Sequence, residues 1–273
     1  MPHAETSDGT KLYYRTAGDG PPLLLCNASF ATHAHWSAQE EPLARRFRVV
    51  TWDYRGHGRS DAPPDAAQYS LTQVVEDLQA VHRAAAGDTP AYVGGLSVGG
   101  LIALSYVLAE PQRVRALLLF NTGPGFKNPA ALAQWQSMLE RTASRMEEVG
   151  LPRFLEGRRA QAELLGLHPE AELGQAARAG ILTSSVAGLT RFARHVAGPV
   201  PNLVDRLAEI QVPSLVLAGE HDMAFQRASQ VLAAKLPRAR RVVLAGAGHV
   251  LNLDQPEAFV REVERFVDTA ADL

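Results

Sequence analysis

Short apolar runs, separated by amphipathic stretches, are the most regular pattern in the chain. Most of the later runs are apolar at consecutive positions, which is typical of strands buried on both faces of a parallel sheet. They predict strands over residues 11–16, 22–28, 47–53, 90–97, 114–122, 212–220 and 240–248. Between two of these runs, Leu71, Val74, Leu78 and Val81 fall on one face of a helix over residues 71–85. The alternation predicts an α/β fold with a mostly parallel central sheet flanked by helices.

One region interrupts this alternation. From residue 126 to residue 199 the pattern is helical, and Trp135, Met138 and Leu139 repeat at helical spacing. Gly and Pro residues divide this region into several segments. We interpret residues 126–199 as a helical cap (lid) inserted into a core formed by residues 1–125 and 200–273.

Composition and charge exclude several classes of protein. Apolar residues make up 46% of the chain and charged residues 21%, which is typical of a packed globular domain. The 27 Lys and Arg against 29 Asp and Glu leave a net charge of −2, so no nucleic-acid partner is expected. The single cysteine, Cys26, lies in an apolar run and is expected to be a buried small hydrophobe. No apolar stretch approaches the ~18 residues of a membrane span, and the start of the chain lacks a signal-peptide pattern. We therefore expect no membrane partner and a cytoplasmic location.

The stretch 95-GLSVGG-100 joins a predicted strand to an apolar helical run. Its G-x-S-x-G pattern occurs by chance roughly one time in ten in a chain of this length, so the context matters more than the motif. A serine on a tight strand-to-helix turn projects its hydroxyl, and small neighbours permit the bend. We therefore predict that Ser97 is a nucleophile and not an ordinary turn residue.

A serine nucleophile needs a base and an acid that orients the base. Asp222 directly follows the strand-like run 215–220, and His249 follows the run 242–248. Their order after Ser97 fits an α/β site built outside the carboxyl ends of the strands. Glu220 is the alternative acid and His221 the alternative base.

Four motifs together resemble the α/β-hydrolase superfamily: 95-GLSVG-99, 53-DYRGHGRS-60, 219-GEHD-222 and 247-AGH-249. The stretches 27-NASFATHAHW-36 and 120-FNTGPG-125 are most similar to the oxoadipate enol-lactonase branch and related carboxylesterases. The resemblance implies an oxyanion hole formed by the backbone N–H groups of Ser29 and Val98. It also implies that residues 53–60 form a structural turn beside the active site.

Relatives often carry His-Gly where this chain has Asn27 and Ala28. Enol-lactonase-like proteins share the Asn, whereas the Cβ of Ala28 leaves the loop geometry open. Phe30 comes next and is expected to line the substrate pocket.

These inferences predict a serine hydrolase acting on a small carboxylic ester or lactone. The substrate would be selected by the apolar residues Phe30, Trp135, Met138, Phe154 and Phe192. Neither a metal nor a cofactor is expected, since nucleotide-binding motifs are missing and His33 and His35 lack a third ligand cluster.

Three other functions stay open. A carbon–carbon bond hydrolase or a perhydrolase uses the same three residues, and a ligand-binding relative without catalysis retains the fold. The oligomeric state is not indicated by the sequence.

One feature of the cap bears on the charge of the substrate. The stretch 186-VAGLTRFARHV-196 places Arg191, Arg194 and His195 among apolar residues. A guanidinium facing the pocket would bind a substrate carboxylate through two hydrogen bonds. A neutral, mostly apolar pocket is the preferred alternative.

Overall fold

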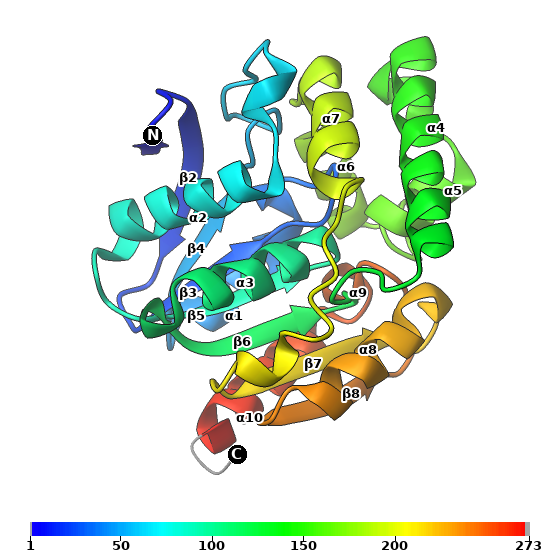
Figure 1. Ribbon diagram of the computed structural model, residues 1–273. Helices are drawn as coiled ribbons and strands as arrows, with labels where there is room; N and C mark the ends of the chain where they lie inside the picture. The colour runs from blue at the N-terminus through cyan, green and yellow to red at the C-terminus, as the bar shows by residue number, and fades with distance from the viewer. Residues whose placement is uncertain (1, 271–273) are drawn as a thin grey trace.

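The computed structural model describes residues 2–270 and contains an eight-stranded sheet (Figure 1). Its strands are β1 (His3–Glu5), β2 (Lys11–Ala17), β3 (Pro22–Cys26), β4 (Arg48–Trp52), β5 (Ala91–Leu96), β6 (Val114–Phe120), β7 (Ser214–Gly219) and β8 (Ala239–Leu244). They lie in the order β1-β2-β4-β3-β5-β6-β7-β8. The pairs β1–β2 and β2–β4 are antiparallel, and the other five pairs are parallel. The predicted strands are confirmed, and β1 is an addition whose three residues are too few for a periodic pattern.

Helices cover both faces of this sheet. They are α1 (Ser37–Ala44), α2 (Leu71–Ala86), α3 (Val98–Ala109), α8 (Met223–Lys235), α9 (Leu251–Asp254) and α10 (Pro256–Thr269). Figure 1 shows α2, α3 and α8 in front of the sheet and α10 behind it. Every residue of β3 and of β7 is buried, as the consecutive apolar positions predict. Cys26, at the end of β3, is fully buried, and burial raises the pKa of its thiol to about 12.

Four helices connect β6 to β7 and gather at one end of the sheet (Figure 1). They are α4 (Pro129–Phe154), α5 (Arg158–Leu164), α6 (Glu172–Ile181) and α7 (Val186–Phe192), followed by a π-helical turn at Ala193–Ala197. The side chain of Asn128 caps the start of α4 by accepting from the N–H of Ala130 at 2.8 Å. At Gly150 a φ of 73° interrupts α4 and lets the chain turn before Pro152.

Buried contacts attach these four helices to the rest of the molecule. The ring of His35 lies 3.0 Å from the carbonyl oxygen of Leu164, and burial lowers the pKa of this histidine to about 4. The backbones of Gly56 and Gly188 meet so closely that a Cβ on Gly56 would lie 2.8 Å from the Gly188 Cα. Within residues 2–270, no helix has the length and apolar character needed to cross a bilayer.

Candidate active site

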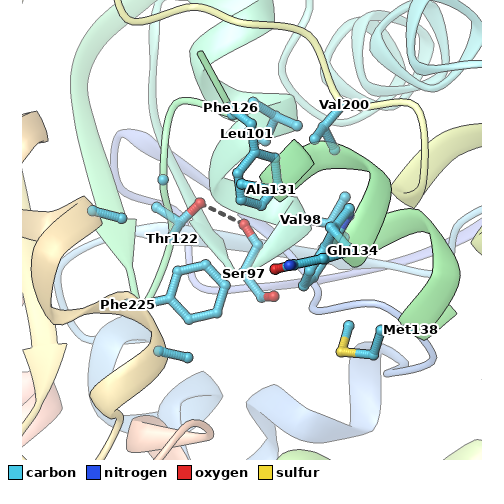
Figure 2. Close-up of a pocket in the computed structure, with 15 residues that line it drawn as sticks. Ser97, Val98, Leu101, Thr122, Phe126, Ala131, Gln134, Met138, Val200 and Phe225 are labelled. Carbon is cyan, nitrogen blue, oxygen red and sulfur yellow. Dashed lines mark hydrogen bonds between the residues drawn. The ribbon is translucent and has the colours of Figure 1, made fainter. Parts of the chain in front are cut away.

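Ser97 lies on the turn between β5 and α3. Its φ of 56° and ψ of −120° are strained for a residue with a side chain, and such strain is concentrated at functional sites. Two hydrogen bonds fix the backbone of this turn. The N–H of Ser97 donates to the carbonyl oxygen of Phe120 at 2.9 Å. The hydroxyl of Thr122 donates to the carbonyl oxygen of Ser97 at 2.6 Å (Figure 2). The hydroxyl of Ser97 therefore projects from a turn whose backbone is held on two sides.

Glycines on both sides of Ser97 are required by close backbone approach. A Cβ on Gly95 would collide with the backbone of Gly99, and a Cβ on Gly99 would lie 2.5 Å from the carbonyl oxygens of Cys26 and Asn27. Side chains would therefore push α3 away from β5 and from the loop after β3. This is the physical reason for the G-x-S-x-G pattern in this chain.

Asp222 and His249 follow β7 and β8, and their side chains meet. The Oδ2 atom of Asp222 lies 2.7 Å from Nδ1 of His249, and Asp222 is 7% exposed. The alternative acid, Glu220, is about half exposed and accepts the N–H of Gly246 at 2.8 Å, and His221 is similarly exposed. The geometry therefore pairs His249 with Asp222.

Two residues that the sequence did not single out brace the loops of this pair. Asn121, buried after β6, donates to the carbonyl oxygens of Gly248 and His249 and accepts the N–H of Gly219, each at 2.8 Å. Asp254 accepts the N–H of Gly248 at 2.8 Å and the N–H of Leu167 at 2.7 Å. Asn121 thus joins the ends of β7 and β8, and Asp254 ties the His249 loop to the chain after α5.

The loop after β3 is anchored at Asn27. Its side-chain amide donates to Trp52 O at 2.6 Å and accepts from the Trp36 indole at 2.8 Å, and its carbonyl oxygen accepts from the Tyr54 hydroxyl at 2.7 Å. A φ of 67° at Phe30 then turns the chain.

The backbone N–H groups of Ser29 and Val98 are the two predicted oxyanion donors. In residues 2–270, neither the N–H of Ser29 nor that of Val98 donates a hydrogen bond to the protein. Val98 is the first residue of α3, where the helix dipole favours negative charge.

Two cavities meet at Ser97. Cavity A, of about 400 Å³, is lined mainly by apolar side chains, including Leu101, Phe126, Ala131, Val200 and Ala228 (Figure 2). Cavity B, of about 160 Å³, contains both Asp222 and His249 together with Ser29, Phe30, Arg159 and Glu163. Ser97, Trp135, Met138, Ala224 and Phe225 line both cavities. The structure therefore brings together the three predicted catalytic residues, Ser29, Val98, Phe30, Trp135 and Met138.

Phe154 and Phe192, which were expected to contact substrate, do not line either cavity. Phe192 is fully buried and stacks on Tyr54 with ring centroids 5.1 Å apart, so it joins α7 to the turn after β4. Phe154 packs, half-buried, against the hydrophobic core. Helical spacing identified both as inward-facing, but it does not distinguish a face packed on the core from one that borders a cavity.

The arginines considered for carboxylate binding also lie elsewhere. Arg194 forms ion pairs with Glu140 at 2.8 Å and Glu147 at 2.6 Å, and Arg191 donates to Pro63 O at 3.4 Å. Neither residue borders cavity A or cavity B. The arginine that borders cavity B is Arg159, which pairs with Glu163 at 2.7 Å.

Polar residues of the stretch 53–60 are engaged in buried contacts, as the resemblance implies. Arg55 donates to both carboxylate oxygens of Asp77, at 2.7 and 2.6 Å. Asp53 accepts a hydrogen bond from the ring of His33 at 2.9 Å. These contacts hold the turn after β4 against α2 and against the segment that follows β3.

Comparison with known proteins identifies the family to which this chain belongs. The family model described as the alpha/beta hydrolase fold matches residues 21–256. The chain belongs to the α/β-hydrolase family. The enol-lactonase of Burkholderia xenovorans LB400 is 25% identical, with a TM-score of 0.83, 98% of this chain covered and 100% of that chain. An esterase of Thermogutta terrifontis is 25% identical, with a TM-score of 0.86 and 98% of each chain covered.

A curated relative extends the range of named reactions. A Bacillus subtilis protein, provisionally named a 2-succinyl-6-hydroxy-2,4-cyclohexadiene-1-carboxylate synthase, is 29% identical over 271 residues, which is 96% of each chain. This α/β-hydrolase thus resembles proteins named for different reactions. The reaction in this chain has to be argued from its own site.

Several cavity residues were missed by sequence reasoning. Phe225 stacks on the ring of His249 with centroids 5.3 Å apart, and it follows Asp222 by three residues at the start of α8. That spacing places Phe225 one helical turn from Asp222 and would have been a usable signal. Gln134, one residue before Trp135, carried no such signal because it lies on an exposed face of α4.

Proposed function

We propose that the protein is a serine hydrolase that cleaves a small carboxylic ester or lactone through an acyl-enzyme on Ser97. The observation that carries the proposal is a strained serine at the junction of two cavities, one of which also contains the Asp222–His249 pair. A turn serine without catalytic function has no need of either feature.

The proton transfers follow from the contact between the acid and the base. A carboxylate of Asp222 accepts the Nδ1–H of His249, so the lone pair of the imidazole is on Nε2. Nε2 takes the proton of Ser97 as Oγ attacks the acyl carbon, and then delivers it to the leaving oxygen. Asp222 keeps the imidazole in this tautomer and stabilises its charged form.

Negative charge that develops on the carbonyl oxygen needs donors that have no other partner. The N–H groups of Ser29 and Val98, which have no partner among residues 2–270, meet this requirement, and the start of α3 adds a favourable dipole. Water, activated by His249, then hydrolyses the acyl-enzyme. In this proposal the segment 126–199 serves as the cap, since α4 supplies one wall of both cavities and α5 adds to the wall of cavity B.

Covalent labelling tests the nucleophile. A fluorophosphonate should attach to the protein once, and peptide mass spectrometry should find the label on Ser97. Ser97→Ala should abolish the labelling and lower turnover by roughly 10⁴–10⁶-fold. Ser105→Ala, a change of the same kind at a partly buried position of α3 that borders neither cavity, is the matched control and should keep both.

A turnover screen with p-nitrophenyl esters, lactones and vinylogous diketones tests the reaction. Ester or lactone cleavage that disappears in Ser97→Ala supports the proposal. Cleavage confined to diketones would assign the site to carbon–carbon bond hydrolysis. Binding without turnover, or a label on another residue in an active preparation, would exclude the acyl-enzyme.

A further inference from the structure

The two cavities that meet at Ser97 differ in size and in chemistry. Cavity A has about 400 Å³ and cavity B about 160 Å³. The following inference rests on the proposed function, because it assigns the two halves of an ester to these two spaces.

The position of His249 decides which half of the substrate each cavity receives. The leaving oxygen takes its proton from the imidazole, so the leaving alcohol has to lie on the side of His249. His249 and Ser29 border cavity B and do not border cavity A. With the oxyanion directed at the N–H groups of Ser29 and Val98, the remaining substituent of the tetrahedral carbon extends into cavity A. That substituent is the acyl chain.

Cavity A offers this chain an almost entirely apolar lining. Leu101, Phe126 and Val200 contribute aliphatic and aromatic surface, whereas the hydroxyl of Thr122 already donates to the backbone of Ser97 (Figure 2). The polar side chain apart from Ser97 and Thr122 is Gln134, on the exposed face of α4. Burying methylene groups here stabilises the complex by about 0.8 kcal/mol for each group.

Cavity B has less than half of that volume and a polar wall. Arg159 and Glu163 pair with each other at 2.7 Å, so they add no net charge, and Thr142 supplies a hydroxyl. A short alcohol fits this space, and a long alkyl alcohol would have to pass between paired charges.

We propose that the enzyme is selective for open-chain esters that join a medium-length aliphatic acyl group to a short alcohol. The acyl group occupies cavity A and the alcohol leaves through cavity B.

Two isomeric esters separate this assignment from its reverse. Ethyl octanoate and octyl acetate have the same formula and differ only in which side of the ester carries the long chain. Acid release at constant pH gives kcat/KM for each. We expect ethyl octanoate to be preferred by at least about tenfold, since each misplaced methylene group costs binding energy. Equal rates, or a preference for octyl acetate, would overturn the assignment.

Filling each cavity in turn sharpens the test. Ala228→Leu narrows cavity A from α8 and should lower kcat/KM for ethyl octanoate about tenfold, with ethyl acetate changed less than about twofold. Ala131→Leu, on α4, narrows the same cavity from another element and serves if the first variant folds poorly. Thr142→Leu is the matched control in cavity B. It should leave the ratio of kcat/KM for ethyl octanoate to kcat/KM for ethyl acetate unchanged. A larger loss of octanoate selectivity in Thr142→Leu than in both cavity A variants would contradict the proposal.

Failure of the inference differs from failure of the proposed function. A protein that labels at Ser97 and hydrolyses p-nitrophenyl acetate, but cleaves neither isomer or cleaves both equally, remains a serine hydrolase without this selectivity. A protein that neither labels nor hydrolyses any ester contradicts the proposed function itself.

Discussion

The turn that carries Ser97 and the helix α4 that borders it are held by opposite kinds of contact. Around Ser97, backbone meets backbone: Gly95 approaches Gly99, and Gly99 approaches the carbonyl oxygens of Cys26 and Asn27. On α4, side chains make the contacts, and several of them are exposed. The Trp135 indole donates to Ala197 O at 2.7 Å.

This difference separates two requirements of the site. Positions of reacting groups tolerate little error, because a misplacement of about 1 Å can cost 10²-fold in rate. Backbone contacts with no room for a side chain meet this requirement. The shape of a cavity can change through single side chains, and α4 presents such side chains to cavities A and B. We therefore expect substitutions around Ser97 to change kcat and substitutions on α4 to change selectivity.

After the loss of Ser97 itself, the largest effect is expected at the acid. Asp222→Asn should retain the fold but lower kcat about 10⁴-fold, since an amide favours the wrong tautomer of His249. Steady-state kinetics with circular dichroism would measure both quantities. Glu220→Gln is the matched control, because Glu220 lies on the same loop but bonds to Gly246 instead. If Glu220→Gln lost more activity than Asp222→Asn, the role of the acid would pass to Glu220.

A second prediction tests the backbone contacts directly. Gly99→Ala puts a Cβ 2.5 Å from two backbone oxygens, so the free energy of unfolding should fall by about 3 kcal/mol. The displaced turn should also lower kcat in the protein that remains folded. Gly157→Ala, before α5, is the control, since its nearest neighbour, Phe154 O, is 3.3 Å away. Urea unfolding should show that Gly157→Ala lowers the free energy of unfolding by less than about 1 kcal/mol. An equal loss in both variants would remove the distinction between the two regions.

The residues that the sequence predicted depend on local motifs, whereas those that it missed depend on contacts between distant parts of the chain. The positions of Ser97, Asp222 and His249 after β5, β7 and β8 were predictable, because local motifs and chain order specify where strands end. Asn121 was not, because its role consists of hydrogen bonds to backbone groups 98 and 127 residues away. Such bonds depend on the register of β6, β7 and β8, which no local pattern encodes.

The apolar residues of the segment 126–199 were predicted with mixed success for a related reason. Trp135 and Met138 line the cavities, and Phe192 is packed on Tyr54. All three lie at helical spacing on inward faces. Whether an inward face meets a cavity or the core depends on how the helices are placed, and the chain order of α4 and α7 does not determine that placement.

A third prediction concerns a buried contact outside both regions, which joins the turn after β4 to α7. His57 is fully buried against Tyr54 and Phe192, and burial lowers its pKa from 6.5 to about 4. Between these values the unfolded chain binds a proton that the folded chain does not, so stability falls as the pH decreases from 6.5 toward 4. His57 should contribute about 2 kcal/mol to the loss between pH 7 and pH 5.

Urea unfolding at both pH values measures this contribution. His57→Gln should reduce the difference in unfolding free energy between pH 7 and pH 5, even though the variant is less stable at both. His168→Gln makes the same change at an exposed histidine and should leave the difference as it is. An unchanged difference in His57→Gln would mean that His57 is protonated in the folded protein.

The smallest effect is expected at Arg194, which bonds α4 to the π-helical turn through Glu140 and Glu147. Its side chain is 27% exposed and its partners are 55% and 45% exposed, so the pairs are largely solvated. Arg194→Ala should therefore lower the free energy of unfolding by no more than about 1 kcal/mol. Because Arg194 borders neither cavity A nor cavity B, KM for a carboxylate-bearing ester and KM for its neutral analogue should change by the same small factor.

Arg159→Ala gives the matched comparison, since this arginine borders cavity B and Glu163 would be left there without its partner. That variant should raise KM more for the anionic ester than for the neutral one, through repulsion by the remaining carboxylate. A selective rise of KM for the anionic ester in Arg194→Ala would instead restore Arg194 as a carboxylate-binding residue. Such a result would require the π-helical turn to move toward Ser97 when substrate binds, and α4 would then take part in positioning the reacting groups.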